Sequence, residues 1–150
     1  MYDSILVATD GSETAETAVT HGLELAKRFD AALYGITVVD VRTAYDTGIV
    51  DPDEVEQHLR EQAADWLADL EAAAADADLA VETTIRTGVP HEEILEYAAE
   101  TDIDVIVVGA RGRSSFRGAL LGSTVDRVVR VADRTVLVVG DASGSSSGAN

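Results

Sequence analysis

Two hydrophobic periods alternate along the chain, and this alternation restricts the possible folds more than any other feature. Short apolar runs typical of buried strands, such as Ile5-Leu6-Val7-Ala8, are followed by longer stretches with apolar residues at i, i+3 and i+4. Strands that alternate with amphipathic helices indicate βαβ units and a parallel sheet. We therefore expect an α/β fold in which five parallel strands and four helices form a doubly wound sheet with right-handed crossovers.

Candidate capping residues and apolar runs locate the individual elements. The expected strands cover residues 5–8, 32–39, 79–86, 105–108 and 136–139. Ser12 and Asp51 are expected N-caps, and Pro52 fits the first helical position after Asp51. The run Ser123-Thr124-Val125-Asp126 fits a capping box that begins at Ser123. The third strand has one wetter face and is expected at a sheet edge, whereas the fourth is apolar throughout and should be central.

The length and composition are those of one folded domain. A chain of 150 residues can bury its own core, and we expect residues 1–140 to form the domain and the Gly/Ser-rich residues 141–150 to be a disordered tail. The absence of Cys excludes disulfides and thiol chemistry. The start of the chain lacks a positively charged leader and no apolar run reaches membrane-spanning length, so a cytoplasmic protein is expected.

The chain is strongly acidic, with 28 acidic residues against 11 basic ones and a formal net charge of -17. Such a charge repels phosphate backbones and anionic membranes, so neither nucleic acid nor a membrane is an expected partner. Strong screening in a high-salt cytosol would reduce the self-repulsion of so many carboxylates. A halophilic origin is therefore our hypothesis, and an ordinary acidic protein is the alternative.

A glycine-rich segment after the fourth predicted strand has the composition of a phosphate site. Gly109, Gly112 and Gly122 have the spacing G-x2-G-x9-G and are followed by Ser123 and Thr124. Glycines let the backbone approach an anion closely, and the helix that follows presents free N–H groups to it. The two hydroxyls would bind phosphate oxygens or a phosphate-bound metal.

Two arginines of this segment, Arg111 and Arg113, would add charge-assisted hydrogen bonds. The segment is neither a P-loop nor a dinucleotide fingerprint, because G-x-x-x-x-G-K-[ST] and G-x-G-x-x-G are both absent. If the strands that end near Asp10 and Gly109 are neighbours from which the chain winds in opposite directions, their carboxyl ends open a crevice at the topological switch point. A crevice of that kind is the usual ligand site of such a sheet.

The spacing resembles the nucleotide-binding motif of the universal stress protein family, G-x2-G-x9-G-[ST], which residues 105–124 match without a gap. Residues 5–12, the turn Gly88-Val89-Pro90 and the closing strand at 135–139 resemble the same family in the same order. The similarity covers residues 1–140 and implies a Rossmann-like fold.

The resemblance also implies an adenine nucleotide, namely ATP with Mg²⁺, and a set of residues that contact it. It implies that Ala8, Thr9 and Asp10 border the adenosine, that the backbone of Val38 or Val39 contacts the adenine, and that Gly109 lies by the ribose. The residues implied to hold the phosphates are Gly112, Gly122, Ser123 and Thr124, with Val125 beside them. Arg111 and Arg113 stand at less fixed positions of the family motif and affect which phosphates are held.

A homodimer is expected through the last strand. Val136 to Val139 are apolar although the topology places them at a sheet edge, and a bare apolar edge favours pairing. The family resemblance implies the same dimer.

The leading functional hypothesis is a binding module in which the nucleotide changes a dimer or partner surface under stress. One alternative is a slow ATP hydrolase, for which Asp10 is the one candidate general base in the crevice. Another is a stress protein that binds no nucleotide, against which the intact glycine motif argues. A phosphorylated receiver domain is excluded, because Arg86-Thr87-Gly88 has no Asp at the end of the third strand.

Several other polar or aromatic residues are assigned no chemistry. His21, His58 and His91 have no ligand spacing and are expected on exposed helix positions rather than in a metal site. Trp66 falls on the apolar face of its helix, so core packing is expected rather than stacking on a base.

Overall fold

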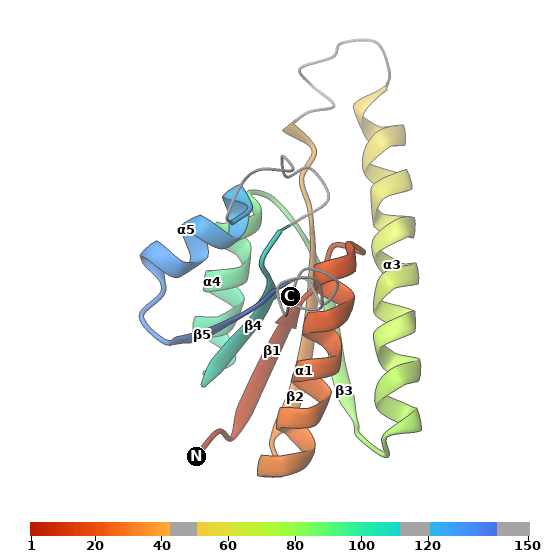
Figure 1. The fold of residues 1–150 in the computed structure, drawn as a ribbon. Helices are drawn as coiled ribbons and strands as arrows, with labels where there is room; N and C mark the ends of the chain where they lie inside the picture. The colour runs from red at the N-terminus through yellow and green to blue at the C-terminus, as the bar shows by residue number, and fades with distance from the viewer. Residues whose placement is uncertain (43–50, 112–120, 141–150) are drawn as a thin grey trace, which may run out of the picture.

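The computed structural model describes residues 1–42, 51–111 and 121–140, and these form a parallel sheet covered by helices (Figure 1). The elements are β1 (Ser4–Ala8), α1 (Glu13–Phe29), β2 (Ala32–Val39), α3 (Pro52–Asp76), β3 (Val81–Thr87), α4 (Pro90–Glu100), β4 (Val105–Gly109), α5 (Ser123–Val131) and β5 (Thr135–Val139). The predicted α/β fold is confirmed. The expected tail at 141–150, and Gly112 and Arg113, lie outside the described residues.

The strand order β3-β2-β1-β4-β5 contains the predicted switch point. From β1 the chain proceeds outward through β2 to β3, then crosses to β4 on the other side of β1 and continues to β5. β1 and β4 are parallel neighbours, with Ile5 opposite Val105 and Val7 opposite Val107. The third strand lies at an edge as predicted, and β5 forms the other edge.

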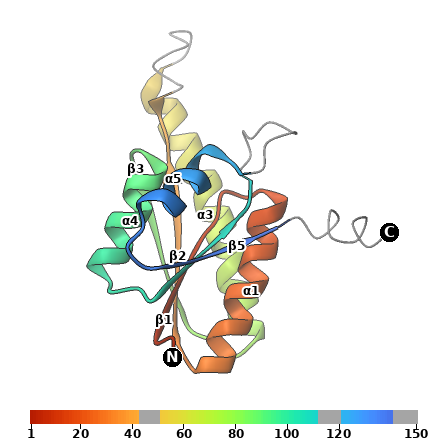
Figure 2. The ribbon, with the colours of Figure 1, turned by 60° about the vertical axis from the view of Figure 1, so that its left-hand side comes forward.

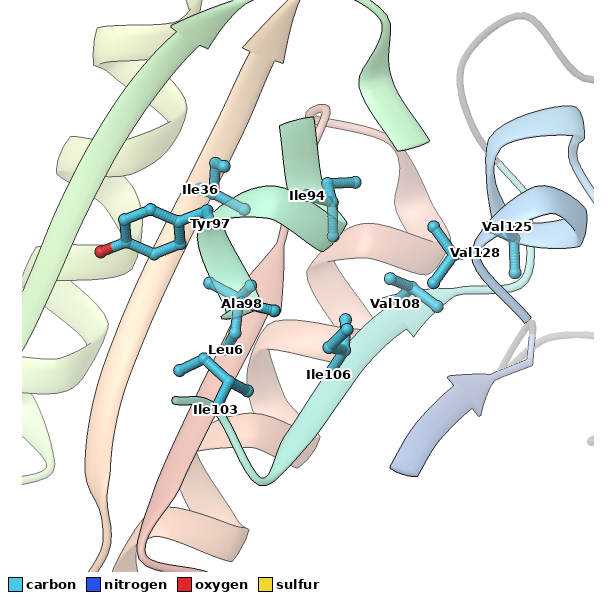
Figure 3. Close-up of a cluster of buried hydrophobic side chains, with 10 residues drawn as sticks. All are labelled: Leu6, Ile36, Ile94, Tyr97, Ala98, Ile103, Ile106, Val108, Val125 and Val128. Carbon is cyan, nitrogen blue, oxygen red and sulfur yellow. The ribbon is translucent and has the colours of Figure 1, made fainter. Parts of the chain in front are cut away.

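Helices cover both faces of the sheet, and alternate residues of each central strand point to opposite faces. Leu6, Ile106 and Val108 pack with α4 and α5 in one hydrophobic cluster (Figure 3). Ile5 and Val107 pack on the opposite face, in the cluster that α1 and α3 cover. Because both faces are buried, β1 and β4 are continuous apolar runs rather than alternating ones. In the two views, α1 and α3 lie on one side of the sheet and α4 and α5 on the other (Figures 1 and 2).

Two predicted N-caps are confirmed. The Ser12 side chain accepts a hydrogen bond from the Ala15 N–H at the start of α1. Asp51 accepts one from the Asp53 N–H, and Pro52 is the first residue of α3.

The third predicted cap, Ser123, is wrong by one residue. Gly122 is the N-cap of α5, and it makes no side-chain hydrogen bond to the helix. The Gly122 carbonyl accepts the Asp126 N–H at 2.9 Å, while the Gly122 N–H donates to the Ala110 carbonyl at 2.8 Å. This tie to the end of β4 fixes where the helix starts, so Ser123 is the first helical residue rather than the cap.

Candidate functional site

A cavity of about 600 Å³ opens at the carboxyl ends of β1, β2 and β4, at the switch point of the sheet. Residues from the start of α4 and α5 and from one side of α3 complete its walls. The predicted site residues that line it are Ala8, Thr9, Asp10, Val38, Val39, Gly109, Arg111, Gly122, Ser123, Thr124 and Val125. The structure therefore brings residues from four separate segments of the chain to one place.

The turn after β1 is tied to β2 by two hydrogen bonds. The Thr9 N–H donates to the Ile36 carbonyl at 3.0 Å, and the buried Thr37 hydroxyl donates to the Thr9 carbonyl at 2.9 Å. The carboxylate of Asp10 lines the cavity and also accepts the Ser12 N–H at 3.0 Å. Asp10 thus organises the turn, which is a structural role beside any contact with a ligand.

The same turn and the first turn of α1 hold the beginning of the glycine-rich segment. The Thr14 hydroxyl contacts the Arg111 carbonyl and accepts the Arg111 N–H at 3.3 Å. The Ser12 hydroxyl donates to the same carbonyl at 3.3 Å. Ser12 lines the cavity although it was not among the predicted site residues. The sequence signals for it were its cap position and its place in the family-like segment 5–12.

The first turn of α5 is the most suitable place for an anion. Ser123, Thr124 and Val125 line the cavity, and the first N–H groups of any helix have no acceptor within that helix. The N-cap, Gly122, has no side chain that could accept hydrogen bonds from them. Helix-terminal N–H groups and the helix dipole favour negative charge, and the neighbouring hydroxyls supply further donors. The arrangement can therefore hold phosphate oxygens.

The opposite part of the cavity is mostly apolar. Val38 and Val39 come from the end of β2, Leu59 and Trp66 from α3, and Ile94 from α4. Leu59, Trp66 and Ile94 were not predicted as site residues, because helical periodicity shows that they face inward but not which inward residues lie beyond the ends of the strands.

The interpretation of Trp66 as a core residue needs correction. Trp66 is only partly buried and lines the cavity, whereas the fully buried positions of α3 are Ala63, Leu67, Leu70 and Ala74. The inward face of α3 therefore divides into a part that packs on the sheet and a part that faces the cavity.

An ion pair between Asp40 and Arg42 lines the cavity on the side of β2. The Arg42 guanidinium donates to both carboxylate oxygens of Asp40, at 2.9 Å from Nε and 2.7 Å from Nη2. The side-chain hydrogen bond from Arg42 is the main cause of a pKa of Asp40 below its ordinary value of 3.8. Asp40 therefore stays ionised with its charge opposed by Arg42, and the pair leaves this wall without a large excess of either charge.

Within the described residues, side chains that could bind a metal are not gathered at one place. His21 and His58 are exposed on α1 and α3, and no group of three or more His, Cys, Asp or Glu residues within the described ranges is arranged to hold a metal ion. None of the helices in the described part of the chain is long and apolar enough to cross a membrane.

Comparison with known proteins identifies the family. The model of the universal stress protein family matches residues 1–140. Universal stress protein MJ0531 of Methanocaldococcus jannaschii is 34% identical over 140 residues, which cover 93% of this chain and 82% of that protein.

Solved structures agree with the sequence comparison. Universal stress protein UspA from Lactobacillus plantarum has a TM-score of 0.82 at 31% identity, and the match covers 92% of this chain and 97% of that one. A universal stress protein in complex with cAMP has a TM-score of 0.72 at 26% identity, over 94% of this chain and 99% of that one. The chain therefore belongs to the universal stress protein family.

Proposed function

We propose that the cavity binds an adenine nucleotide, with ATP as the ligand, and that the protein acts as a nucleotide-dependent binding module in a stress response. The observation that supports this most directly is that the two ends of one cavity differ in chemistry. The start of α5, where Ser123 and Thr124 supply hydroxyls and the Gly122 cap has no side chain, forms one end. Apolar side chains from β2, α3 and α4, beside the Asp40–Arg42 ion pair, form the other. A nucleotide has the same division, since its phosphates are anionic and its base presents flat aromatic faces that pack against apolar side chains.

The size of the cavity and a relative support the same ligand class. A volume of about 600 Å³ lies within the range of small-molecule sites. A family member with a similar fold was solved in complex with cAMP, which is an adenine nucleotide. The negative net charge of the protein does not prevent it from binding an anionic nucleotide. The donors at the start of α5 attract the phosphates at contact distance, whereas the repulsion from the net charge is a long-range effect that salt screens.

At the polar end, the N–H groups and hydroxyls of Ser123 and Thr124 would hold the phosphates, and Arg111, which lines the same cavity, would add positive charge. Asp10 is the carboxylate best placed on this cavity to meet a metal, and Mg²⁺ commonly binds through one or two carboxylates together with substrate phosphates. These residues thus fit a metal that binds together with the nucleotide. When bound, Mg²⁺ would neutralise part of the charge of the phosphates.

Equilibrium dialysis of ATP with magnesium in high salt tests the proposal. The parent should bind saturably, and Ser123→Ala and Gly122→Val should weaken binding because they remove a donor or crowd the start of α5. Thr20→Ala removes a hydroxyl from an exposed position of α1 and is the matched control, so it should bind like the parent. Absence of saturable binding by the parent would overturn the proposal.

ADP release in the same samples addresses the hydrolase alternative. The carboxylate of Asp10 already accepts the Ser12 N–H, which favours a role in the turn over a free general base. We therefore expect the parent to release no ADP above the rate in buffer. Release that Asp10→Asn abolishes while ATP binding persists would instead favour the enzyme.

A homodimer through β5 is part of the proposed function. Within the part of the chain that the structure describes, β5 pairs only with β4, and Val136, Leu137 and Val138 are only partly buried. Ala110, at the end of β4, donates its N–H to the Val139 carbonyl and accepts the Gly122 N–H. Through these two hydrogen bonds, Ala110 connects the start of α5, where the phosphates would bind, with β5, the edge strand of the proposed dimer.

A further inference from the structure

Trp66 is the only Trp of the chain. It lines the cavity in which we propose that the nucleotide binds. We infer that the indole of Trp66 forms a wall against which the base of the bound nucleotide packs. This inference rests on the proposed function and adds to it a residue that distinguishes a nucleotide from a bare polyphosphate.

The indole is held at the cavity by a contact with Gly11. A Cβ on Gly11 would lie 2.3 Å from Cε2 and 2.4 Å from Nε1 of Trp66, so the ring lies directly against the glycine backbone. Gly11 also has a φ of +77°, a conformation that other residues adopt with strain. Residue 11 is thus restricted to glycine in two ways, and the ring is positioned before any ligand binds. A preorganised wall lowers the cost of binding.

The side of α3 on which Trp66 lies separates it from the core. The buried face of α3 packs on the sheet, where Leu67 and Leu70 lie against Gly35 of β2. The N-terminal end of α3 extends past the carboxyl ends of β1 and β4 (Figure 1). Leu59 and Trp66 are two helical turns apart and share another face of the helix, and both line the cavity. Core packing explains the buried leucines but not a partly exposed indole at the mouth of a ligand site.

The strand order determines which end of a nucleotide would meet this ring. β4 and the start of α5 lie on one side of β1, whereas β2 and α3 lie on the other. A nucleotide with its phosphates on Ser123 and Thr124 therefore extends across the Thr9–Asp10 turn toward β2. There Val39 and Trp66 on one side, and Ile94 of α4 on the other, leave an apolar space for a flat group.

The chemistry of this space favours a base over other apolar groups. Aromatic side chains stack on any nucleobase, because every base presents a flat π-face. Trp66 thus accounts for attraction to the base, while the start of α5 accounts for attraction to the phosphates. Loss of the Trp66 ring should therefore weaken the binding of ATP but not the binding of a ligand that has phosphates and no base.

The test compares ATP with inorganic tripolyphosphate by equilibrium dialysis, using the parent, Trp66→Ala and Trp66→Phe. Trp66→Ala should weaken ATP binding by roughly 5- to 150-fold, the range that loss of one base–aromatic stack produces. Its affinity for tripolyphosphate should match that of the parent. Trp66→Phe keeps a flat ring and should retain most of the ATP affinity. Phe29→Ala removes a half-exposed aromatic side chain at the end of α1, away from the cavity, and should change neither ligand.

Intrinsic fluorescence provides a second measurement on the unmodified protein, because all Trp emission comes from Trp66. Emission should change saturably with ATP at the midpoint found by dialysis, and tripolyphosphate should leave it nearly unchanged. ATP binding by Trp66→Ala equal to that of the parent would overturn the inference and leave the proposed function standing. Equal losses for ATP and tripolyphosphate would also overturn it, since they indicate a damaged site. No ATP binding by the parent would overturn both.

Discussion

Gly109 lies directly against the first turn of α1, so that a Cβ on Gly109 would lie 2.5 Å from the carbonyl carbon of Thr14 and 2.6 Å from its Oγ1. The contact joins the last residue of β4 to α1, the first helix of the chain. The φ of Gly109 is not positive, so the glycine is needed for space and not for an unusual backbone conformation. The first glycine of the motif thus has a packing role that exists without any ligand.

Gly109→Ala should therefore destabilise the fold itself. The methyl group would meet backbone atoms of Thr14, which cannot move without shifting α1, and overpacking of this kind costs about 1–3 kcal/mol. The free energy of unfolding, measured by urea denaturation in high salt without nucleotide, should fall by that amount.

Gly140→Ala is the control, because a Cβ on Gly140 would have no neighbour within 4 Å. Its free energy of unfolding should equal that of the parent. If Gly109→Ala unfolded at the parent's urea concentration, the packing role of Gly109 would be wrong.

The fold could be predicted because its signals are local. The apolar runs at 5–8 and 105–108 coincide with buried strands, and Ser12 and Asp51 cap helices as their residue types predict. The switch point was expected on the condition that the strands ending near Asp10 and Gly109 are neighbours, and the strand order shows that they are. The residues expected on the cavity from β1, β4 and α5 then followed from the ends of those elements.

What sequence reasoning missed depends on contacts between distant segments. Periodicity placed Trp66 on the inner face of its helix, but only the contact with Gly11 shows that the ring stands beside a cavity. The start of α5 was misplaced because the bond from the Gly122 N–H to the Ala110 carbonyl has no signature in either residue type. Both features need the relative position of elements far apart in the chain.

Asp104→Asn should remove a pH-dependent contribution to stability. The Asp104 carboxylate accepts the backbone N–H groups of Asp3 and Ser4 at 2.6 and 3.0 Å, and the bond from Asp3 is the main cause of a pKa of Asp104 below its ordinary value of 3.8. A lowered pKa means that the folded state favours the ionised form. The contribution is therefore complete above the ordinary pKa and is lost as the pH falls through the lower, folded-state value.

Urea denaturation across the acid range measures this effect. The parent should be more stable than Asp104→Asn at neutral pH, and the difference should shrink as the pH falls below 3.8. Asp65→Asn, which neutralises an exposed carboxylate of α3, controls for the loss of one negative charge. A parent–variant difference that stays constant down to the acid limit would contradict the proposed role of Asp104.

Val138→Lys should convert the proposed dimer to a monomer. Val138 is a partly buried residue of the edge strand β5, and a Lys there places a charge where a second copy of the strand would pair. Sedimentation velocity should give a monomer, with helix and sheet content unchanged by circular dichroism. Phe29→Lys makes the same kind of change at a half-exposed site in α1 and should stay dimeric. A folded Val138→Lys variant that remains a dimer would exclude β5 as the interface.

The net charge of -17 predicts that salt stabilises the protein. With 28 acidic residues and 11 basic ones, repulsion between carboxylates outweighs attraction, although Arg86 pairs with Glu93, Glu96 and Glu100. The Debye length falls from about 10 Å at 0.1 M salt to about 3 Å at 1 M, so added salt screens the many distant repulsions more than the few contact pairs. The urea midpoint should therefore rise with KCl concentration.

The double variant Asp65→Asn/Asp69→Asn tests the cause, because it removes two exposed charges from α3 without touching the core. Its urea midpoint should exceed that of the parent at low salt and approach it at high salt, since less repulsion remains to be screened. A parent midpoint that stays level or falls as KCl increases would show that the carboxylates do not limit stability, and the halophilic hypothesis would lose its physical basis.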